Sequence, residues 1–124
     1  MTDLTDHAKN LLGRALCGRL PSLPSSIFAA LGTGGADATG VTGEPAGNGY
    51  ARQRLTFTGT GTQRNLSAVS FTFTGAVGSL SHLGLFDAAT GGNPLTWAPL
   101  SAPVTVAGPG TVTVPADALT VTPE

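Results

Sequence analysis

Charged residues are scarce in this sequence. Only 10% of its 124 residues are Asp, Glu, Lys or Arg, whereas an ordinary soluble domain carries about 25%. Lys9 is the single lysine, and the formal net charge is -1. Because binding to phosphates needs a surplus of positive charge, we expect no nucleic-acid partner.

Cysteine and long apolar runs are also scarce. Cys17 is the single cysteine, so no disulfide can form within the chain, and we expect it to be a small buried residue on a helix. No apolar run approaches the roughly 20 residues of a membrane-spanning helix, so no membrane partner is expected. The first six residues include acids where a secretory signal would carry Lys or Arg, which favours assembly in a cytoplasm.

Glycine and proline are abundant instead, with 18 Gly and 9 Pro. Hydrophobic residues make up 40% of the chain and the mean hydropathy is +0.19, which argues against disorder. Glycine and proline mark turns and the many threonines favour strands, so the composition indicates short strands joined by tight turns. The length predicts one domain over residues 1–124.

Residues 2–20 are the helical candidate. Apolar residues recur at helical spacing along one stripe of this segment, namely Leu4, Ala8, Leu11, Leu12, Ala15 and Leu16. Thr2 or Asp3 is predicted to cap the helix, and Pro21 to end it. Two internal glycines weaken it, so it needs a surface to pack against. We expect that surface to be its own domain, with a neighbouring subunit as the alternative.

We predict that residues 26–122 form an antiparallel, jelly-roll-like β-sandwich, because short strand patterns alternate with turn signals throughout this segment. Residues 69–73 alternate between apolar and polar side chains, which predicts a half-buried strand. Residues 104–106 and 111–114 flank a Gly-Pro-Gly turn and predict a β-hairpin. The glycine-rich stretch 32–49 has no periodicity and predicts a long loop.

The strand around His82 is predicted to be central, because both of its faces are apolar. One face would carry Leu80, His82, Gly84 and Phe86, and the other Leu83 and Leu85. We therefore expect His82 to be a hydrogen-bonded core or interface residue. Ser79 and Ser81 would lie on the face opposite His82, so no serine–histidine catalytic arrangement is expected. The chain is accordingly predicted not to be an enzyme.

Oxygen-bearing side chains do not follow the regular spacing of a calcium loop. The candidates are Asp37, Glu44, Asp87 and Asn93. Asp87 is better interpreted as a turn-capping carboxylate that accepts backbone N–H groups of the following turn. We predict no metal and no cofactor.

A local basic patch is predicted on one strand. Arg52 and Arg54 alternate with uncharged residues, and Arg64 follows from the next strand. Together with Tyr50 they form our predicted subunit interface, because arginine is favoured where proteins meet. A surface of Thr, Gly and Ala with so few charges, and sheet edges without lysine, favours a homo-oligomer in which neighbouring copies cover the edges. The loop 32–49 is the other expected contact.

Carbohydrate binding is the alternative interpretation. Tyr50 and Trp97 are the single Tyr and Trp, and an exposed aromatic ring beside an amide such as that of Asn93 could hold a sugar. Trp97 packed into the core would argue against this interpretation.

Three segments resemble a known family: Gly49–Gln53, His82–Asn93 and Val104–Val106. They are similar to short phage structural proteins labelled tail-fibre or minor tail proteins, which occur in siphophages, prophages and gene transfer agents. The resemblance runs in order from Ile27 to Val121. It implies a small β-rich component of the virion, without catalytic activity, that acts in structure or host attachment.

The length limits this role further. A folded chain of this size has a radius of gyration of about 14 Å, too small for a fibre shaft. We expect a base or adaptor that attaches to capsid or tail proteins and receives a separate fibre protein, because the sequence stops at Pro123–Glu124 directly after the last predicted strand. A head spike at a capsid vertex is favoured over the tail, and assembly would take place in the bacterial cytoplasm.

Overall fold

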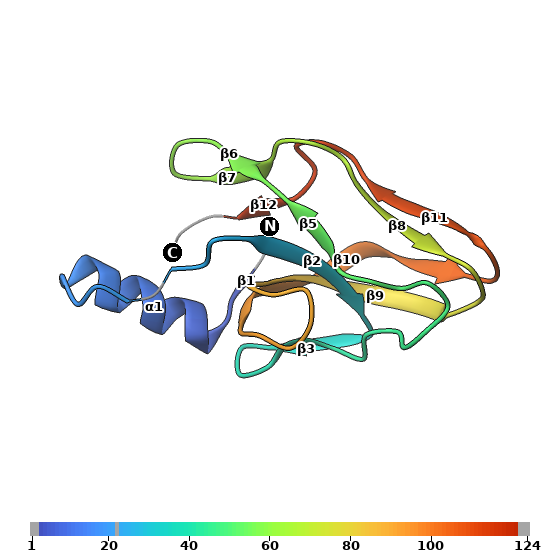
Figure 1. The fold of residues 1–124 in the computed structure, drawn as a ribbon, viewed down its shortest axis with the longest axis horizontal. Helices are drawn as coiled ribbons and strands as arrows, with labels where there is room; N and C mark the ends of the chain where they lie inside the picture. The colour runs from blue at the N-terminus through green and yellow to red at the C-terminus, as the bar shows by residue number, and fades with distance from the viewer. Residues whose placement is uncertain (1–2, 22, 122–124) are drawn as a thin grey trace.

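Antiparallel strands are the main secondary structure of the protein, and one helix lies near its start, as the sequence predicted (Figure 1). The computed structural model describes residues 3–21 and 23–121. The predicted boundary residues 2 and 122, the proposed cap Thr2 and the expected end at Pro123–Glu124 lie outside the described residues.

A five-stranded antiparallel sheet forms the larger layer, with the strand order β1-β10-β9-β2-β5. Its members are β1 (Asp3–Leu4), β2 (Ile27–Gly32), β5 (Gln53–Leu55), β9 (Gly78–Phe86) and β10 (Pro94–Val106). The central strand β9 pairs with β2 on one side and with β10 on the other. The sequence had therefore placed the strand around His82 correctly.

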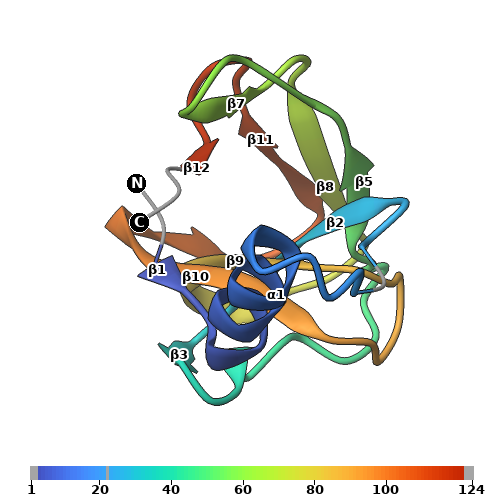
Figure 2. The same ribbon diagram turned by 90° about the vertical axis from the view of Figure 1, so that its left-hand side faces the viewer.

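Two smaller sheets face the larger one on one side (Figure 2). They are β8 (Val69–Phe73) with β11 (Gly110–Val114), and β6 (Phe57–Thr58) with β7 (Gln63–Asn65) and β12 (Thr120–Val121). The hairpin of β3 (Gly34–Ala36) with β4 (Gly40–Thr42) covers the opposite face of the larger sheet, where Val41 packs with Ala30. The hydrophobic core lies between the layers, giving a sandwich-like arrangement. It contains Leu31, Leu83 and Leu85 from the large sheet, and Phe71 and Phe73 from β8.

Strand β8 follows its predicted alternation. Val69, Phe71 and Phe73 are buried and the residues between them are exposed. The faces of β9 differ from the prediction, because Leu80 shares the main core with Leu83 and Leu85 rather than a face with Phe86. The register of β10 against β9 shifts between Pro99 and Val104, and such a bulge changes which face a side chain points to.

The predicted hairpin of residues 104–106 with 111–114 is wrong. Strand β11 pairs instead with β8, and β10 keeps β9 as its partner through Val106. The Gly-Pro-Gly segment therefore carries the chain from one layer to the other. The predicted loop 32–49 is wrong in part, since it contains the hairpin β3–β4.

The helix α1 (Asp6–Leu16) is shorter than the predicted span 2–20. Asp3 lies in β1, and Thr5 caps the helix: its hydroxyl accepts a hydrogen bond from the Ala8 N–H at 3.2 Å and donates to the Pro94 carbonyl at 2.6 Å. The helix ends at a C-cap on Cys17, before Pro21, and Cys17 is exposed rather than buried.

Candidate functional site

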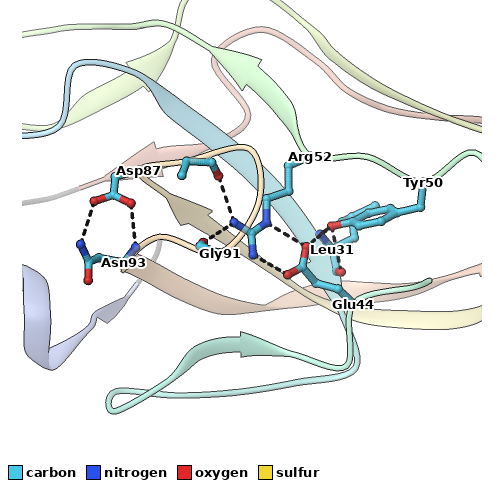
Figure 3. A network of polar contacts seen from close by, with 8 residues as sticks. Leu31, Glu44, Tyr50, Arg52, Asp87, Gly91 and Asn93 are labelled. Carbon is cyan, nitrogen blue, oxygen red and sulfur yellow. Dashed lines mark hydrogen bonds and ion pairs between the residues drawn. The ribbon is translucent and has the colours of Figure 1, made fainter. Parts of the chain in front are cut away.

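A buried arginine lies at the centre of the best-connected polar cluster (Figure 3). The Arg52 guanidinium bonds both carboxylate oxygens of Glu44, from Nε at 3.0 Å and from Nη2 at 2.7 Å. Its Nη1 donates to the carbonyls of Ala88 at 3.0 Å and Gly91 at 2.8 Å. The same group lies 3.8 Å from the centre of the Phe86 ring, at cation–π distance. Only 9% of the Arg52 side chain is exposed.

Tyr50 completes this cluster. Its hydroxyl donates to Glu44 Oε2 at 2.6 Å and accepts from the Leu31 N–H at 3.1 Å. Burial works to raise the pKa of the Glu44 carboxyl, but the hydrogen bonds from Arg52 and Tyr50 outweigh it and hold that pKa below its ordinary value. Burial, followed by the bond to Glu44, raises the pKa of Tyr50, and the bond to Glu44 raises the pKa of Arg52.

The cluster joins segments that are distant in sequence. Glu44 follows the β3–β4 hairpin, Arg52 precedes β5, and the two carbonyls belong to the turn between β9 and β10. A hollow of about 410 Å³ lies over them, yet the charges that face it already bond each other. The arrangement therefore stabilises the fold rather than offering a ligand its hydrogen-bonding groups.

Asp87 caps the β9–β10 turn, as predicted. Its carboxylate accepts from the Asn93 backbone N–H at 2.7 Å and from the Asn93 amide at 3.1 Å. Burial works to raise the pKa of Asp87, but these bonds outweigh it and leave that pKa lowered. The turn is thus held at its base by Asp87 and, farther along, by Arg52 (Figure 3).

A second polar cluster attaches the helix to the sandwich. Trp97 Nε1 donates to Asp37 Oδ1 at 2.8 Å, and Lys9 from α1 pairs with Asp37 Oδ2 at 3.2 Å. The Trp97 bond and then Lys9 lower the pKa of the Asp37 carboxyl. Asp37 lies between β3 and β4, so this part of the predicted loop contacts its own chain.

His82 is half-buried beside Trp97, with ring centres 6.2 Å apart. Contrary to the prediction, Ser81 contacts it, since Ser81 Oγ lies 2.8 Å from His82 Nδ1. Among the side chains that the structure describes, no carboxylate bonds the imidazole. A triad needs a third group of that kind to orient the base.

The predicted interface residues do not come together. Arg52 faces inward, whereas Arg54 is exposed on β5. Arg64 lies on β7 and pairs with Asp117 at 2.7 Å. The two arginines of the predicted strand therefore do not form one basic face. The alternating pattern predicted that they share a face, because it could not show that Arg52 bonds Glu44 and is buried by that contact.

The three residues of the carbohydrate interpretation are also bonded within the chain. Trp97 bonds Asp37, Asn93 bonds Asp87, and Tyr50 bonds Glu44. Tyr50 and Trp97 lie in separate clusters, the first against Phe71 and Phe73, the second against His82. Trp97 is partly buried and packs against a small apolar cluster.

Sequence reasoning missed a set of exposed leucines in α1 and the segment after it, which we call the leucine ridge: Leu12, Leu16, Leu20 and Leu23. Leu16 is 88% exposed, Leu20 is 90% exposed and Leu23 is 63% exposed. The helical stripe suggested that Leu12 and Leu16 would be buried. Figure 1 shows why they are not: α1 and the segment after it extend past the end of the sheets.

The described residues lack two further features. No helix in residues 3–21 and 23–121 is long and apolar enough to cross a membrane. The same residues contain no group of three or more His, Cys, Asp or Glu side chains placed to hold a metal ion.

Comparison with known protein families gives a match over most of the chain. The family model described as podophage GP4 fiber I protein gp80 matches residues 3–122, which is nearly the whole chain. No curated protein matches the sequence.

Proposed function

The chain belongs to the podophage GP4 fiber I protein gp80 family, and from this premise we propose that it is a non-enzymatic base or adaptor of a fibre or spike on a phage-like particle. One surface would bind a capsid or tail protein, and another would receive a separate fibre protein. The family match over residues 3–122 carries the proposal.

The internal bonding of the polar side chains supports a structural role. Glu44, Asp37, Asp87 and Asp117 each accept bonds from side chains or backbone of the same chain. Groups used in this way stiffen loops and are poorly placed to exchange protons with a substrate. A small, rigid domain is suited to connect a capsid or tail protein with a separate fibre protein.

Assembly into a homo-oligomer is part of this proposal. Strand β11, with the sequence Gly-Thr-Val-Thr-Val, carries no charge to discourage edge-to-edge pairing. The exposed Arg54 and the half-exposed Arg64 with Asp117 remain the candidate contacts from the predicted interface set. Closed rings are the usual way in which identical subunits cover such edges.

The deciding experiment compares particles made with and without this gene by cryo-electron microscopy. We expect density to disappear with the gene. Loss at the capsid vertices would identify a head-spike base, the location favoured from the sequence, and loss at the tail would identify a tail-fibre adaptor. If no density disappears and purified particles lack the chain, the structural role is overturned and glycan binding becomes the leading hypothesis.

A further inference from the structure

Strand β11 has a free edge. It pairs with β8 in a two-stranded sheet, and within residues 3–21 and 23–121 no strand pairs with its other edge. The β8–β11 layer is therefore narrower than the five-stranded sheet that it faces (Figure 2). Natural proteins protect free edges with charged residues or proline, but β11 contains neither. An unprotected edge of this kind is a template for pairing with another chain.

The hydrogen bonds at the end of β8 show how that strand is turned. Thr74, directly after β8, donates its N–H to the Asn48 carbonyl at 2.8 Å rather than to β11. Backbone groups of successive residues point to opposite sides of a strand. The backbone groups of Phe71 and Phe73 are therefore directed towards β11.

The register then gives the orientation of β11. Phe71 lies opposite Val112, so Thr111 and Thr113 direct their N–H and C=O groups away from β8. The side chains agree with this assignment, because Thr113 Oγ1 lies 3.2 Å from Ser70 Oγ on the neighbouring strand. Side chains approach closely in pairs that do not exchange backbone hydrogen bonds. The free edge of β11 thus presents two donors and two acceptors.

A hollow of about 480 Å³ lies beside this edge. Val112 and Val114 line one side of it, Pro99 and Leu100 of β10 line the other, and the core residue Leu83 lies between them. All of its lining residues are uncharged. A further strand beside β11 would cover this hollow and the part of β10 that borders it.

We propose that the free edge of β11 pairs antiparallel with β11 of a second copy of this chain, about a two-fold axis at Val112. This inference rests on the homo-oligomer of the proposed function and names its contact. Thr111 then lies opposite Thr113 of the second copy, and their outward backbone groups exchange hydrogen bonds. The two small sheets join into one sheet of four strands. Val112 of the second copy lies beside Val112, at the hollow.

The sequence of β11 favours a second copy over a foreign strand. A two-fold contact sets one patch against itself, so any charge on it meets a like charge. Residues 109–116 carry no charge. Threonine and valine alternate along the strand, so reversal about Val112 sets threonine opposite threonine on the exposed face and valine opposite valine on the inner face. A second copy therefore supplies a matching strand that is already ordered by β8, which lowers the entropic cost of pairing.

The test measures mass in solution by size-exclusion chromatography with light scattering. Thr111→Glu/Thr113→Glu sets carboxylates against carboxylates across the two-fold axis, and Thr111→Lys/Thr113→Lys does the same with ammonium groups. Ser70→Glu/Thr72→Glu is the matched control. Ser70 and Thr72 are also exposed and lie opposite Thr113 and Thr111 in the same sheet, but on β8, away from the free edge.

We expect wild type and the β8 control to be dimers, and each β11 variant to dissociate at least tenfold more readily. Mixing the Glu and Lys variants should restore the dimer, because each carboxylate then lies opposite an ammonium group. Circular dichroism of each variant checks that it is folded. Dissociation without recovery on mixing would assign the edge to a different strand and overturn the inference.

Two other outcomes separate this inference from the attachment role. A monomeric wild type at high concentration, or a Glu variant that associates as wild type does, would overturn the inference. Neither result changes the comparison of particles with and without the gene. If that comparison fails while the dimer and its response to the β11 variants hold, the proposed attachment role is overturned alone.

A disulfide tests the register. Val112 faces its counterpart in a pair without backbone hydrogen bonds, where Cα atoms lie about 4.5 Å apart, within disulfide range. Cys17→Ser/Val112→Cys should form a linked dimer on mild oxidation, as measured by non-reducing electrophoresis. Cys17→Ser/Val104→Cys is the control, since Val104 is also half-buried at the hollow but lies on β10. Equal linking of the two variants, or none in the first, would overturn the register centred on Val112.

Discussion

The sandwich body and the helical end of this molecule differ in how far their apolar side chains are buried and their polar groups are hydrogen-bonded. In the body, the core leucines and phenylalanines are buried, and Arg52 makes four hydrogen bonds within the chain. At the helical end, large leucines face solvent and Arg14 has a buried donor without an acceptor in the described residues. The contrast separates the part of the sequence that serves the fold from a part whose large apolar side chains the described residues leave uncovered.

The largest expected effect comes from removing the cation at the centre of the body. Arg52→Ala leaves the Glu44 carboxylate partly buried without its ion pair, and should lower the free energy of unfolding by about 3 kcal/mol. Urea denaturation followed by fluorescence measures it. Arg54→Ala, an exposed arginine two residues away, serves as the control and should change stability by less than about 0.5 kcal/mol. Equal effects of the two substitutions would show that the buried ion pair adds no stability beyond that of an exposed arginine.

The same ion pair predicts a dependence on pH. Because the pKa of folded Glu44 lies below its ordinary value of 4.5, the unfolded chain binds more protons there, so stability falls as the pH drops through the folded pKa. We expect Glu44→Gln to be less stable than wild type at pH 7 but to lose less stability on acidification. Urea midpoints measured between pH 7 and pH 3 test this. Parallel curves for the two proteins would exclude Glu44 as a contributor.

A smaller effect is expected at the joint between the two regions. Thr5 is fully buried and bonds both the helix and Pro94 of the body. Thr5→Ala should lower the free energy of unfolding by about 1–2 kcal/mol, as loss of a helix cap does. Amide hydrogen exchange should accelerate most within α1. An equal acceleration across β8 would show that the helix and body unfold as one unit.

The smallest effect is expected on the leucine ridge. Leu16→Ser replaces a side chain that is 88% exposed, so the free energy of unfolding should stay within about 0.5 kcal/mol of wild type. Leu83→Ser, inside the core at 4% exposure, is the comparison and should be strongly destabilising. A large loss of stability in Leu16→Ser would mean that the ridge serves the fold.

Local patterns predicted the elements better than their partners. The alternation of Val69, Phe71 and Phe73 identified β8, and the glycines, Asn93 and Pro94 after Asp87 identified the turn that it caps. Each of these signals lies within a few residues of the structure it predicts. The partner of β11 could not be read in this way, because pairing with β8 depends on how two layers stack.

The candidate site was predicted less well for a related reason. Arg52 and Arg54 have the same spacing as two residues on one strand face, yet Arg52 precedes β5 and bonds Glu44 instead. Helical periodicity likewise placed Leu16 on the apolar stripe of the helix, but it could not show that this side chain is exposed. Where a segment leaves the body, the period of its sequence says nothing about what covers it.

The pairing of β1 with β10 also sets the order of events during synthesis. Asp3 lies opposite Trp97, and Leu4 opposite Thr96, so the first strand emerges from the ribosome long before its partner. Contacts this far apart in sequence slow folding, and the early segment stays unpaired until its partner strand is available. The helix that follows β1 can therefore be fixed in its final position only after residues 96 and 97 have left the ribosome. A chain interrupted before that point cannot present the leucine ridge in its native position.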